Sequence, residues 1–532
     1  MIELRPTQTQ YIRQRVQAFH DGFRHNLALL GPPGVGKTTV VHAAVHGPAR
    51  RLPMIECQLQ REPLRDFARR IALAVLRAAV EPRIPHGTAW SLEELCEHAS
   101  TVAPATVAAV VQVEGLTKQH ASAELFCRAL DLIAVFQQER GQPCVLLLDE
   151  FLHVDEFGLT HAFHELGKRV MTWSSTLFIL TSSSPFRARQ MLQERLQLLF
   201  GQFEVMTLGP VETAPTVAWM QRELSSAKRY AVLTRFLLHW IGASPWHLHV
   251  FLDRMKELRV LGNMPRADAP SVLLQTAWDV LGRPEGVLHQ WCAGHMARVL
   301  DQPDGPLARD VLIAVAQGLR TTQAIAQRCG TRRRLTEVLQ ALVEQDLIER
   351  KGACWVMPDQ LLACWLTAVL APRLRQQGQD RATVEAQLEA ALTQRWTRWV
   401  VASEQPFEQR IRHLMKQFRN ETVSLDSKTG RMPVFHALEL TPSLEPRMTY
   451  VVADGEERRW CCLVHEGMLE EHHVAEFERF CRTQAPKPSR KVVVAKEGLE
   501  LNAKLLAKNA NMWVWEPTDL NMLCLLYGQS PF

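Results

Sequence analysis

The sequence lacks the features that mark secreted, disulfide-linked and membrane-spanning proteins. Its twelve cysteines are scattered, and no two of them form a Cys-x-x-Cys pair, which argues against a zinc site or a disulfide framework and favours a reducing compartment. The first residues, Met1–Arg5, contain no apolar signal-peptide segment, and no uninterrupted apolar run is long enough to span a bilayer. We therefore expect a cytoplasmic protein with no membrane contact.

A strong charge of either sign is also missing. Lys and Arg number 61 against 56 Asp and Glu, so the net charge is only +5. A charge this small permits nucleic-acid binding without indicating it, so local basic clusters must decide. We find no internal repeat and no low-complexity tract. At 532 residues the chain is longer than one typical domain, and about three or four domains are expected.

The sequence does contain one complete phosphate-binding motif. The pattern G-x-x-x-x-G-K-S/T is matched at every position by Gly31-Pro32-Pro33-Gly34-Val35-Gly36-Lys37-Thr38-Thr39. The preceding Asn26–Leu30 predicts a buried strand, and the residues from Thr38 to Ala44 predict a helix start. Backbone N–H groups and the positive end of the helix dipole would then surround a phosphate chain. The alternative, a chance Gly-rich turn, is disfavoured by this strand–turn–helix context.

The motif predicts ATP and Mg²⁺ as cofactors. Lys37 would reach the β- and γ-phosphates, and the Thr38 hydroxyl would ligate Mg²⁺. A second apolar strand, from Cys144 to Leu148, ends in Asp149 and Glu150. Asp149 would hold the Mg²⁺ water shell and Glu150 would polarise the attacking water, because phosphoryl transfer depends on positioning and charge neutralisation. A merely structural carboxylate pair is the alternative.

A third apolar strand, Thr176–Ser184, ends in hydroxyl side chains. Ser182 or Thr181 could sense the γ-phosphate or the attacking water, and we take Ser182 as the candidate catalytic residue; a turn that caps the next helix is the alternative. Three arginines follow this strand: Arg187, Arg189 and Arg195. One of them could act as an arginine finger toward a neighbouring subunit of a homo-oligomer. A solvated helix face is the simpler interpretation.

Together these motifs resemble the archaeal-type ATPase family, which lies close to the STAND and origin-recognition AAA+ ATPases. The resemblance covers roughly residues 1–260 and rests on five features. They are the phosphate-binding motif, Leu146–Glu150, Thr181–Ser184, Leu199–Phe203 and the turn Gly242-Ala243-Ser244-Pro245. The resemblance implies an α/β fold with a five-stranded parallel P-loop NTPase sheet in the order 5-1-4-3-2 and a helical lid. It also implies that the turn, including Pro245, lies against the nucleotide base.

Residues 306–365 predict a winged helix-turn-helix, which the archaeal-type ATPases also carry. Its third helix is expected to span Arg332 to Gln345 and to open with Arg332, Arg333 and Arg334. The N-terminus of a recognition helix enters the major groove, so these residues could contact double-stranded DNA, with Lys351 on the wing touching the backbone. The alternative is a winged helix that packs on the ATPase and controls it.

The end of the chain resembles a restriction-endonuclease-like domain. Such nucleases need an Asp and then Glu-x-Lys on the next strand to hold Mg²⁺. The matching strand ends with Leu463–Gly467 and has no Lys, and the Asp position falls near Thr449 or Tyr450. Nuclease activity is not expected, and the domain would bind DNA or a protein partner. Adjacent His472 and His473 could suggest a metal site, but a solvated helix start is the simpler interpretation.

The expected domains are an ATPase core, a helical lid, the winged helix-turn-helix, a helical connector and the nuclease-like domain. Their boundaries are 1–212, 213–300, 301–372, 373–405 and 406–532. The sequence therefore predicts an ATP-hydrolysing, DNA-binding switch in a mobile element, a defence system or DNA maintenance. The alternatives are a signalling or scaffold ATPase that acts through a protein partner, and an ATP-dependent nuclease.

Overall fold

The computed structural model forms two compact units. One contains residues 1–223 and 242–249, and the other contains residues 224–241 and 250–532. The structure describes residues 4–45, 52–81, 90–118, 123–194, 203–224, 231–242, 244–260, 269–375, 381–426, 428–443, 445, 447–456 and 458–532. The predicted Arg195, the Leu199–Gln202 segment and Ala243 lie outside these residues. Among the described residues, no helix combines the length and apolar composition of a membrane span.

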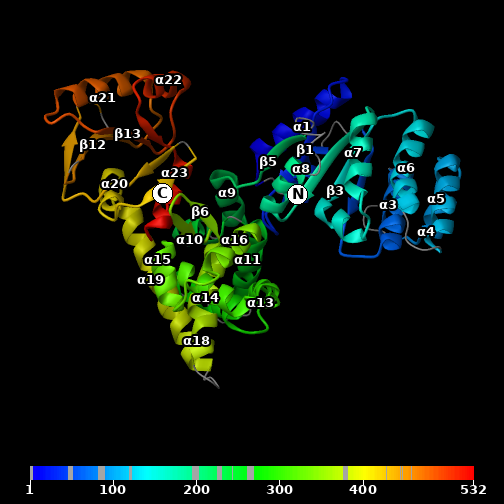
Figure 1. Cartoon of the computed structure of the whole chain (residues 1–532), viewed down its shortest axis with the longest axis horizontal. Coiled ribbons are helices and arrows are strands. Elements are labelled where there is room, and N and C mark those ends of the chain that lie inside the picture. Colours follow the sequence, from blue (N-terminus) through cyan, green and yellow to red (C-terminus); the bar gives the residue numbers. More distant parts are fainter. Residues whose placement is uncertain are drawn as a thin grey trace. The chain divides into compact units, whose positions relative to one another are not determined.

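A five-stranded parallel sheet forms the centre of the first unit (Figure 1). Its strands are β1 (Asn26–Leu30), β2 (Met54–Gln58), β3 (Cys144–Asp149), β4 (Thr176–Ser182) and β5 (Phe203–Thr207). The order β2-β3-β4-β1-β5 confirms the predicted order 5-1-4-3-2. Every residue of β1, β3 and β4 is buried, as expected for parallel strands covered on both faces.

The strand register brings the candidate site residues to one edge of this sheet. Leu30 pairs with Ser182, and Leu148 pairs with Leu180. The residues that follow β1, β3 and β4 therefore meet at the carboxyl edge, which is where ligands bind in open α/β sheets.

Helices cover both faces of this sheet. The helices of this unit are α1 (Pro6–His20), α2 (Lys37–Val45), α3 (Leu64–Val80), α4 (Leu92–Ala99), α5 (Pro104–Thr117), α6 (Ala123–Arg140), the 3₁₀ helix η1 (Phe151–Phe157), α7 (Ala162–Thr172), α8 (Pro185–Glu194) and α9 (Thr213–Leu224), of which α4 and α5 pack on α3 and α6. Leu27 and Leu29 pack with α1 and α2, whereas Ala28 and Leu30 belong to the core under α3, α6 and α7. This alternation follows from the two-residue period of a strand.

Helix α1 ends at His20. Gly22 adopts a left-handed conformation (φ 95°), and the Phe23 N–H donates to the Ala18 carbonyl at 2.8 Å. A left-handed glycine with a hydrogen bond that reaches back five residues is a common helix stop.

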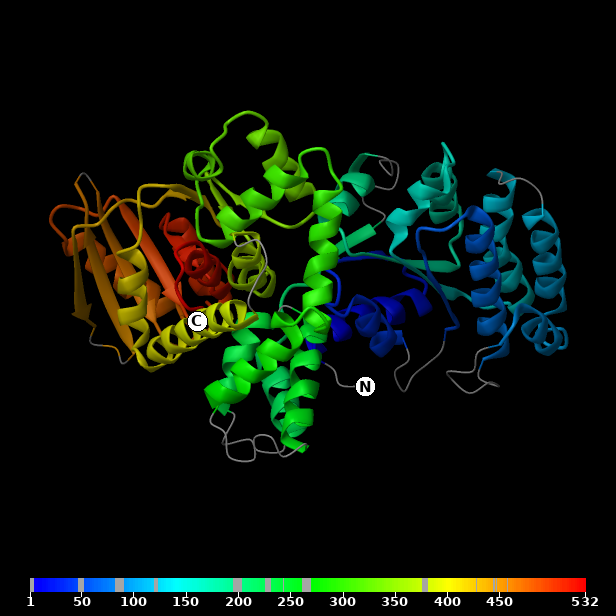
Figure 2. The ribbon, with the colours of Figure 1, turned by 90° about the horizontal axis from the view of Figure 1, so that it is seen from below.

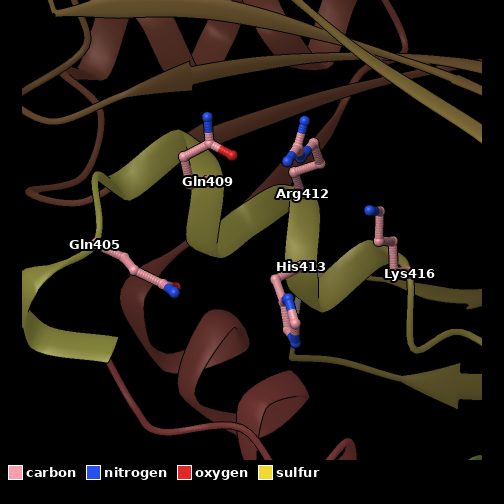
Figure 3. Close-up of a pocket in the computed structure, with 5 residues that line it drawn as sticks. All are labelled: Gln405, Gln409, Arg412, His413 and Lys416. Carbon is pink, nitrogen blue, oxygen red and sulfur yellow. The ribbon is translucent and has the colours of Figure 1, made fainter. Parts of the chain in front are cut away.

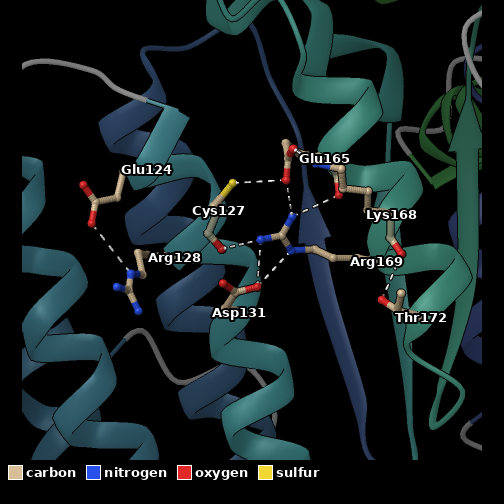
Figure 4. Close-up of polar contacts among 8 residues, drawn as sticks. All are labelled: Glu124, Cys127, Arg128, Asp131, Glu165, Lys168, Arg169 and Thr172. Carbon is tan, nitrogen blue, oxygen red and sulfur yellow. Dashed lines mark hydrogen bonds and ion pairs between the residues drawn. The ribbon is translucent and has the colours of Figure 1, made fainter.

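Helices α6 and α7 are joined by a buried arginine (Figure 4). The Arg169 guanidinium donates to Asp131 Oδ1 at 2.9 Å and to the Cys127 carbonyl at 3.2 Å. It also donates to the Glu165 carbonyl at 3.0 Å. Only 8% of Arg169 is exposed. Helix α6 also carries an exposed pair at 3.8 Å, between Arg128 and Glu124.

Replacing Arg169 by leucine is expected to lower the free energy of unfolding by about 2–3 kcal/mol. Loss of one partner of a buried ion pair costs roughly 3–5 kcal/mol. The cost is expected to be lower here because the Asp131 side chain is about half exposed and can be solvated. The matched control, Arg128→Leu, should cost less than about 1 kcal/mol because its pair is solvated. Urea unfolding of the full chain measures both values. Equal shifts for the two variants would contradict the structural role of Arg169.

The second unit begins with helices. They are α10 (Ala231–Ile241), the later part of α11 (Pro245–Val260), α12 (Ala269–Ala277), the π-helix η3 (Trp278–Gly282), α13 (Val287–Leu300), α14 (Gly305–Ala316), α15 (Thr322–Cys329), α16 (Leu335–Glu344), α17 (Gln360–Trp365), the π-helix η4 (Leu366–Leu370), α18 (Ala371–Arg375) and α19 (Arg381–Glu404). An antiparallel hairpin of β6 (Glu349–Lys351) and β7 (Cys354–Val356) follows α16. The order of α14, α15, α16 and this hairpin matches the predicted segments, and the winged-helix assignment stays a prediction.

One predicted boundary in this region is wrong. We expected the third helix to begin at Arg332, but α16 begins at Leu335. Arg334 precedes it in a left-handed conformation (φ 61°), which cannot continue a right-handed helix. The Thr331 hydroxyl accepts a hydrogen bond from the Arg333 N–H at 3.2 Å, so these residues form a turn.

A second five-stranded sheet ends the chain (Figure 1). Its strands are β10 (Ala437–Pro442), β11 (Met448–Asp454), β12 (Arg459–His465), β13 (Arg490–Ala495) and β14 (Trp513–Trp515). The strands β10, β11 and β12 are antiparallel, and β12, β13 and β14 are parallel. A separate hairpin is formed by β8 (Thr422–Ser424) and β9 (Thr429–Arg431). The sequence did not predict β10, because most of its residues are exposed and give no apolar pattern.

Helices also cover both faces of the second sheet. Helices α20 (Phe407–Met415) and α23 (Pro517–Leu526) pack on one face, and α21 (Glu471–Thr483) and α22 (Leu501–Asn509) pack on the other. Figure 2 shows the sheet with α20 and α23 on the near side. This architecture leaves one polar side of α20 facing away from the sheet.

Candidate functional site

The phosphate-binding loop connects β1 to α2. Gly34 (φ 74°) and Gly36 (φ 91°) both adopt left-handed conformations that favour glycine. A Cβ atom on Gly34 would lie 2.9 Å from the Ser244 hydroxyl and 3.2 Å from Trp246 Cβ. The loop therefore needs glycine at position 34 for space as well as for backbone conformation.

Lys37 points into this loop and toward the end of β4. Its ammonium donates to the Gly31 carbonyl at 2.9 Å and to the Ser183 hydroxyl at 2.7 Å, and it lies 3.7 Å from Glu150 Oε1. Burial lowers the pKa of Lys37, and the Glu150 and Asp149 carboxylates oppose this shift. The loop therefore surrounds a buried positive charge, as a site for an anionic ligand requires.

Thr38 and Asp149 offer hard oxygen atoms side by side. The Thr38 hydroxyl donates to Asp149 Oδ2 at 3.0 Å. The Thr181 hydroxyl donates to Asp149 Oδ1 and so fixes the orientation of this carboxylate. A hydroxyl and a carboxylate are ligands that suit Mg²⁺, so these residues fit the predicted cation.

Glu150 is held in an unusual backbone conformation. Its φ of 57° places it in the left-handed region, although it is not glycine. The Ser183 N–H donates to Glu150 Oε2 at 2.8 Å, and the Ser183 hydroxyl donates to Glu150 Oε1. Backbone strain of this kind is tolerated where surrounding contacts enforce it, and it is concentrated at functional sites.

The structure brings Ser183, and not Ser182, to Lys37 and Glu150. Ser182 is fully buried, and its hydroxyl accepts a hydrogen bond from the Ser184 N–H at 3.1 Å, in a turn before α8. This contact matches the capping alternative that the sequence left open. Ser183 connects the two functional side chains, because its hydroxyl accepts from Lys37 and donates to Glu150.

Replacing Ser183 by alanine is expected to lower the kcat of ATP hydrolysis by about 10–100-fold with little change in KM. The change removes a hydrogen bond to a charged group, worth roughly 1.5–3 kcal/mol. The control Ser182→Ala should keep kcat within about twofold and lose about 1 kcal/mol of stability. Steady-state kinetics and thermal unfolding test both variants. A larger kcat loss in Ser182→Ala would contradict the assignment.

The predicted turn at Gly242–Pro245 packs against the loop. The Ser244 hydroxyl donates to the Gly34 carbonyl at 3.2 Å. Pro245 Cγ would lie 3.9 Å from a Cβ on Gly36. The structure therefore places Pro245 beside the phosphate-binding loop. Its contact with the nucleotide base stays a prediction.

No sequence pattern predicted a role for Arg5. Its guanidinium donates to the Val35 carbonyl at 3.3 Å and to the Pro210 carbonyl at 2.9 Å. Only 2% of Arg5 is exposed, and burial lowers its pKa to about 10. Arg5 thus links the start of α1 to the phosphate-binding loop and to the segment after β5, across 30 and 205 residues of sequence.

The candidate arginine fingers on α8 lie on an exposed surface. Arg187 and Arg189 are both exposed, and Arg189 donates to the Thr207 hydroxyl at 2.7 Å. The solvated-face interpretation therefore fits both residues, and a role toward a neighbouring subunit stays a prediction.

Two of the four predicted DNA-contacting residues are paired within the second unit. Arg334 lies 2.9 Å from Asp304 Oδ1, and Lys351 lies 3.1 Å from Glu349 Oε2. Arg332 and Arg333 are exposed in the turn before α16. The wing and the turn before α16 therefore each have one predicted contact residue paired within the protein.

The positions of the last sheet at which a nuclease would carry its metal ligands have structural contacts instead. The Tyr450 hydroxyl donates to Glu476 at 2.9 Å, and its ring stacks on Phe480 with 4.0 Å between ring centroids. Asp454 is bound by Arg459 at the end of β11. Tyr450 thus supplies no carboxylate at the position where such a nuclease needs an Asp, and the Asp454 carboxylate is held in an ion pair.

The predicted solvated helix start holds for His472, which is exposed at the beginning of α21, but not for His473. It is buried, and its Nδ1 accepts a hydrogen bond from the Glu470 N–H at 3.1 Å, which caps α21. Potential ligand atoms of Glu445, His472 and His473 lie within 4.8 Å of one another. A neutral His473 with this cap carries its proton on Nε2, so neither ring nitrogen is available for a metal.

Comparison with known proteins finds a family similar to much of the first unit. Residues 4–179 match the family model described as an AAA ATPase domain. These residues contain β1 to β3 and the phosphate-binding loop. This part of the chain is therefore similar to AAA ATPase domains, in line with the predicted ATPase core. No curated protein matches the chain.

Several solved structures resemble the chain at low identity. The Walker-type ATPase PABY2304 of Pyrococcus abyssi is 14% identical, with 68% of this chain and 94% of that chain covered and a TM-score of 0.45. The Aeropyrum pernix ORC1 protein in complex with DNA is 15% identical, with coverages of 72% and 92% and a TM-score of 0.34. AMPPCP-bound DnaA from Aquifex aeolicus is 13% identical, with coverages of 62% and 86% and a TM-score of 0.28. Likenesses this weak show nothing further about function.

Proposed function

We propose that this protein is an ATP-hydrolysing switch that binds DNA through its second unit. The observation that carries the ATPase assignment is the cluster of Lys37, Thr38, Asp149, Glu150 and Ser183 at the carboxyl edge of a parallel sheet. Each of these side chains contacts another member of the cluster, so the site is largely assembled before a ligand binds. Preorganisation of this kind is the main source of catalysis in phosphoryl transfer.

Each residue of the cluster has a distinct part in hydrolysis. Lys37 binds the β- and γ-phosphates and offsets their charge. Thr38 and Asp149 hold Mg²⁺, which supplies charge neutralisation when it is bound. Glu150 orients the attacking water, and Ser183 positions Glu150 relative to Lys37.

The DNA-binding part of the proposal rests on Arg332 and Arg333. Both are exposed and stand directly before α16, in a unit whose element order matches a winged helix-turn-helix. Guanidinium groups at the start of a recognition helix can bind phosphates and guanine edges.

The protein would work in the cytoplasm as a monomer or a homo-oligomer, and mass measurement with and without ATP decides between these states.

Fluorescence anisotropy with a labelled duplex, with and without ATP, tests this function. The variant Arg332→Gln/Arg333→Gln should bind more weakly and show a salt slope lower by about 2. The charge-matched control, Arg334→Gln/Lys351→Gln, should bind nearly as well as the natural protein, because its cations are paired. An absence of DNA binding at low salt would overturn the DNA-binding part.

A protein partner is the second candidate, and exposed apolar side chains on α22 and in the loop after β12 favour it. Leu501 is 73% exposed, Leu505 is 53% exposed and Met468 is 46% exposed. A bridge between Leu469 and Leu499 brings the two segments together. Exposed apolar clusters often mark protein contacts. Loss of biological function in Leu501→Ser/Leu505→Ser, with DNA binding intact, would favour this candidate.

A further inference from the structure

The outer side of α20 carries positive charge in a concave surface. The buried side of this helix packs on the sheet through Phe407, Ile411, Leu414 and Met415. The opposite side, together with the turn before the helix, lines a cavity of about 190 Å³ (Figure 3). We call this surface the basic face, and it consists of Gln405, Gln409, Arg412, His413 and Lys416.

The spacing of these residues explains why they share one surface. Gln405, Gln409 and Lys416 follow the helical repeat, and Arg412 and His413 lie between them on the same side. Gln405, His413 and Lys416 are exposed, and the other two are half-buried. An extended ligand can therefore reach all five side chains.

No carboxylate lines the basic face. Among the described parts of the chain, none of its five side chains makes an ion pair or a side-chain hydrogen bond. Arg412 and Lys416 are four residues apart, a spacing at which like charges destabilise a helix. Two other cations of this unit are paired, Arg334 with Asp304 and Arg459 with Asp454. The basic face thus carries a repulsion that an anionic ligand would relieve.

We propose that the basic face binds the phosphate backbone of a nucleic acid. A guanidinium such as that of Arg412 can hold a phosphate through two parallel hydrogen bonds, and Lys416 adds a point charge. The amides of Gln405 and Gln409 can donate to phosphate oxygens. The cavity is smaller than the roughly 300–1,000 Å³ of pockets that enclose a whole ligand, so it fits a phosphate group on a longer chain.

This site is separate from the turn before α16 and does not depend on Arg332 or Arg333. Contacts with phosphates position a nucleic acid without reading its sequence. The basic face would therefore strengthen binding equally for duplexes of different sequence. The basic face would therefore determine the affinity for nucleic acid and its salt dependence, and not the sequence specificity.

The test uses the full chain, a labelled duplex of arbitrary sequence and a titration in salt. For Arg412→Gln/Lys416→Gln, the slope of log Kd against log salt should fall by about 1.8, since each phosphate contact contributes about 0.9. When salt rises from about 50 to 200 mM, the factor by which the affinity falls should accordingly be roughly tenfold smaller in this variant than in the unaltered protein. The matched control is Arg482→Gln/Lys508→Gln, which removes the same charge from exposed positions on α21 and α22 and should leave the slope unchanged.

Two further measurements keep the test decisive. The single variant Lys416→Gln, at an exposed position, should lower the slope by about 0.9 without affecting folding. Polyglutamate should compete more weakly than an unlabelled duplex, because carboxylates do not present the spacing of a phosphate backbone. An unchanged slope in both α20 variants, or equal competition by polyglutamate, would overturn the inference. If only Arg332→Gln/Arg333→Gln loses affinity, the proposed function stands and this inference falls.

Discussion

Replacing Lys37 by alanine is expected to abolish ATP binding and to lower ATP hydrolysis by at least about 10²–10³-fold, the usual effect of losing one preorganised donor to developing charge. The ammonium of Lys37 is the positive charge at the centre of the loop, within 2.9 Å of Gly31 and 2.7 Å of Ser183. Without it, the loop carbonyl and the two carboxylates would repel the phosphates. Isothermal titration with ATP and a phosphate-release assay measure the two effects.

The matched control is Lys168→Ala on α7. Lys168 forms an exposed pair with Glu165 at 2.7 Å, so its loss should leave nucleotide affinity unchanged and cost less than about 1 kcal/mol of stability. Unchanged ATP affinity in Lys37→Ala would show that the nucleotide site is assigned wrongly. Thermal unfolding of both variants separates loss of binding from loss of folding.

Replacing Glu150 by glutamine should separate ATP binding from hydrolysis. The amide keeps the shape of the side chain and can still accept from the Ser183 N–H, so ATP affinity should stay within a few-fold. It cannot accept a proton from the attacking water, so kcat should fall by about 10²–10⁴-fold, the range typical of a general base. Single-turnover hydrolysis and ATP titration provide the two measurements.

Glu156→Gln is the control for this variant. Glu156 lies on η1, six residues after Glu150, and its side chain is exposed. The same loss of charge there should leave kcat unchanged. Hydrolysis by Glu150→Gln at the natural rate would contradict the role of Glu150. If the protein is an ATP-controlled switch, Glu150→Gln should stay in the ATP-bound state for longer than the unaltered protein does. In the presence of ATP, this variant should therefore keep the DNA affinity of that state for longer than one turnover of the unaltered protein.

Much of the first unit could be predicted from the sequence. The phosphate-binding motif, the strand that ends in Asp149-Glu150 and the hydroxyl-rich end of β4 are local patterns, and local patterns are visible without a structure. The parallel sheet order followed from the resemblance that these motifs carry, and the structure confirms it. Strands with exposed side chains, such as β10, gave no such pattern and were missed.

The sequence by itself determined which loop, lysine and carboxylates form the candidate nucleotide site, because their order along the chain defines them. Only the tertiary structure decided which neighbouring hydroxyl faces the site, because the register of β4 against β1 turns Ser182 inward and Ser183 toward Lys37. It also decided the role of Arg5 and the pairing of Arg334, since their partners lie far away in sequence. The basic face of α20 emerged in the same way. A charge in the sequence becomes a binding surface only where the fold brings no opposite charge to it.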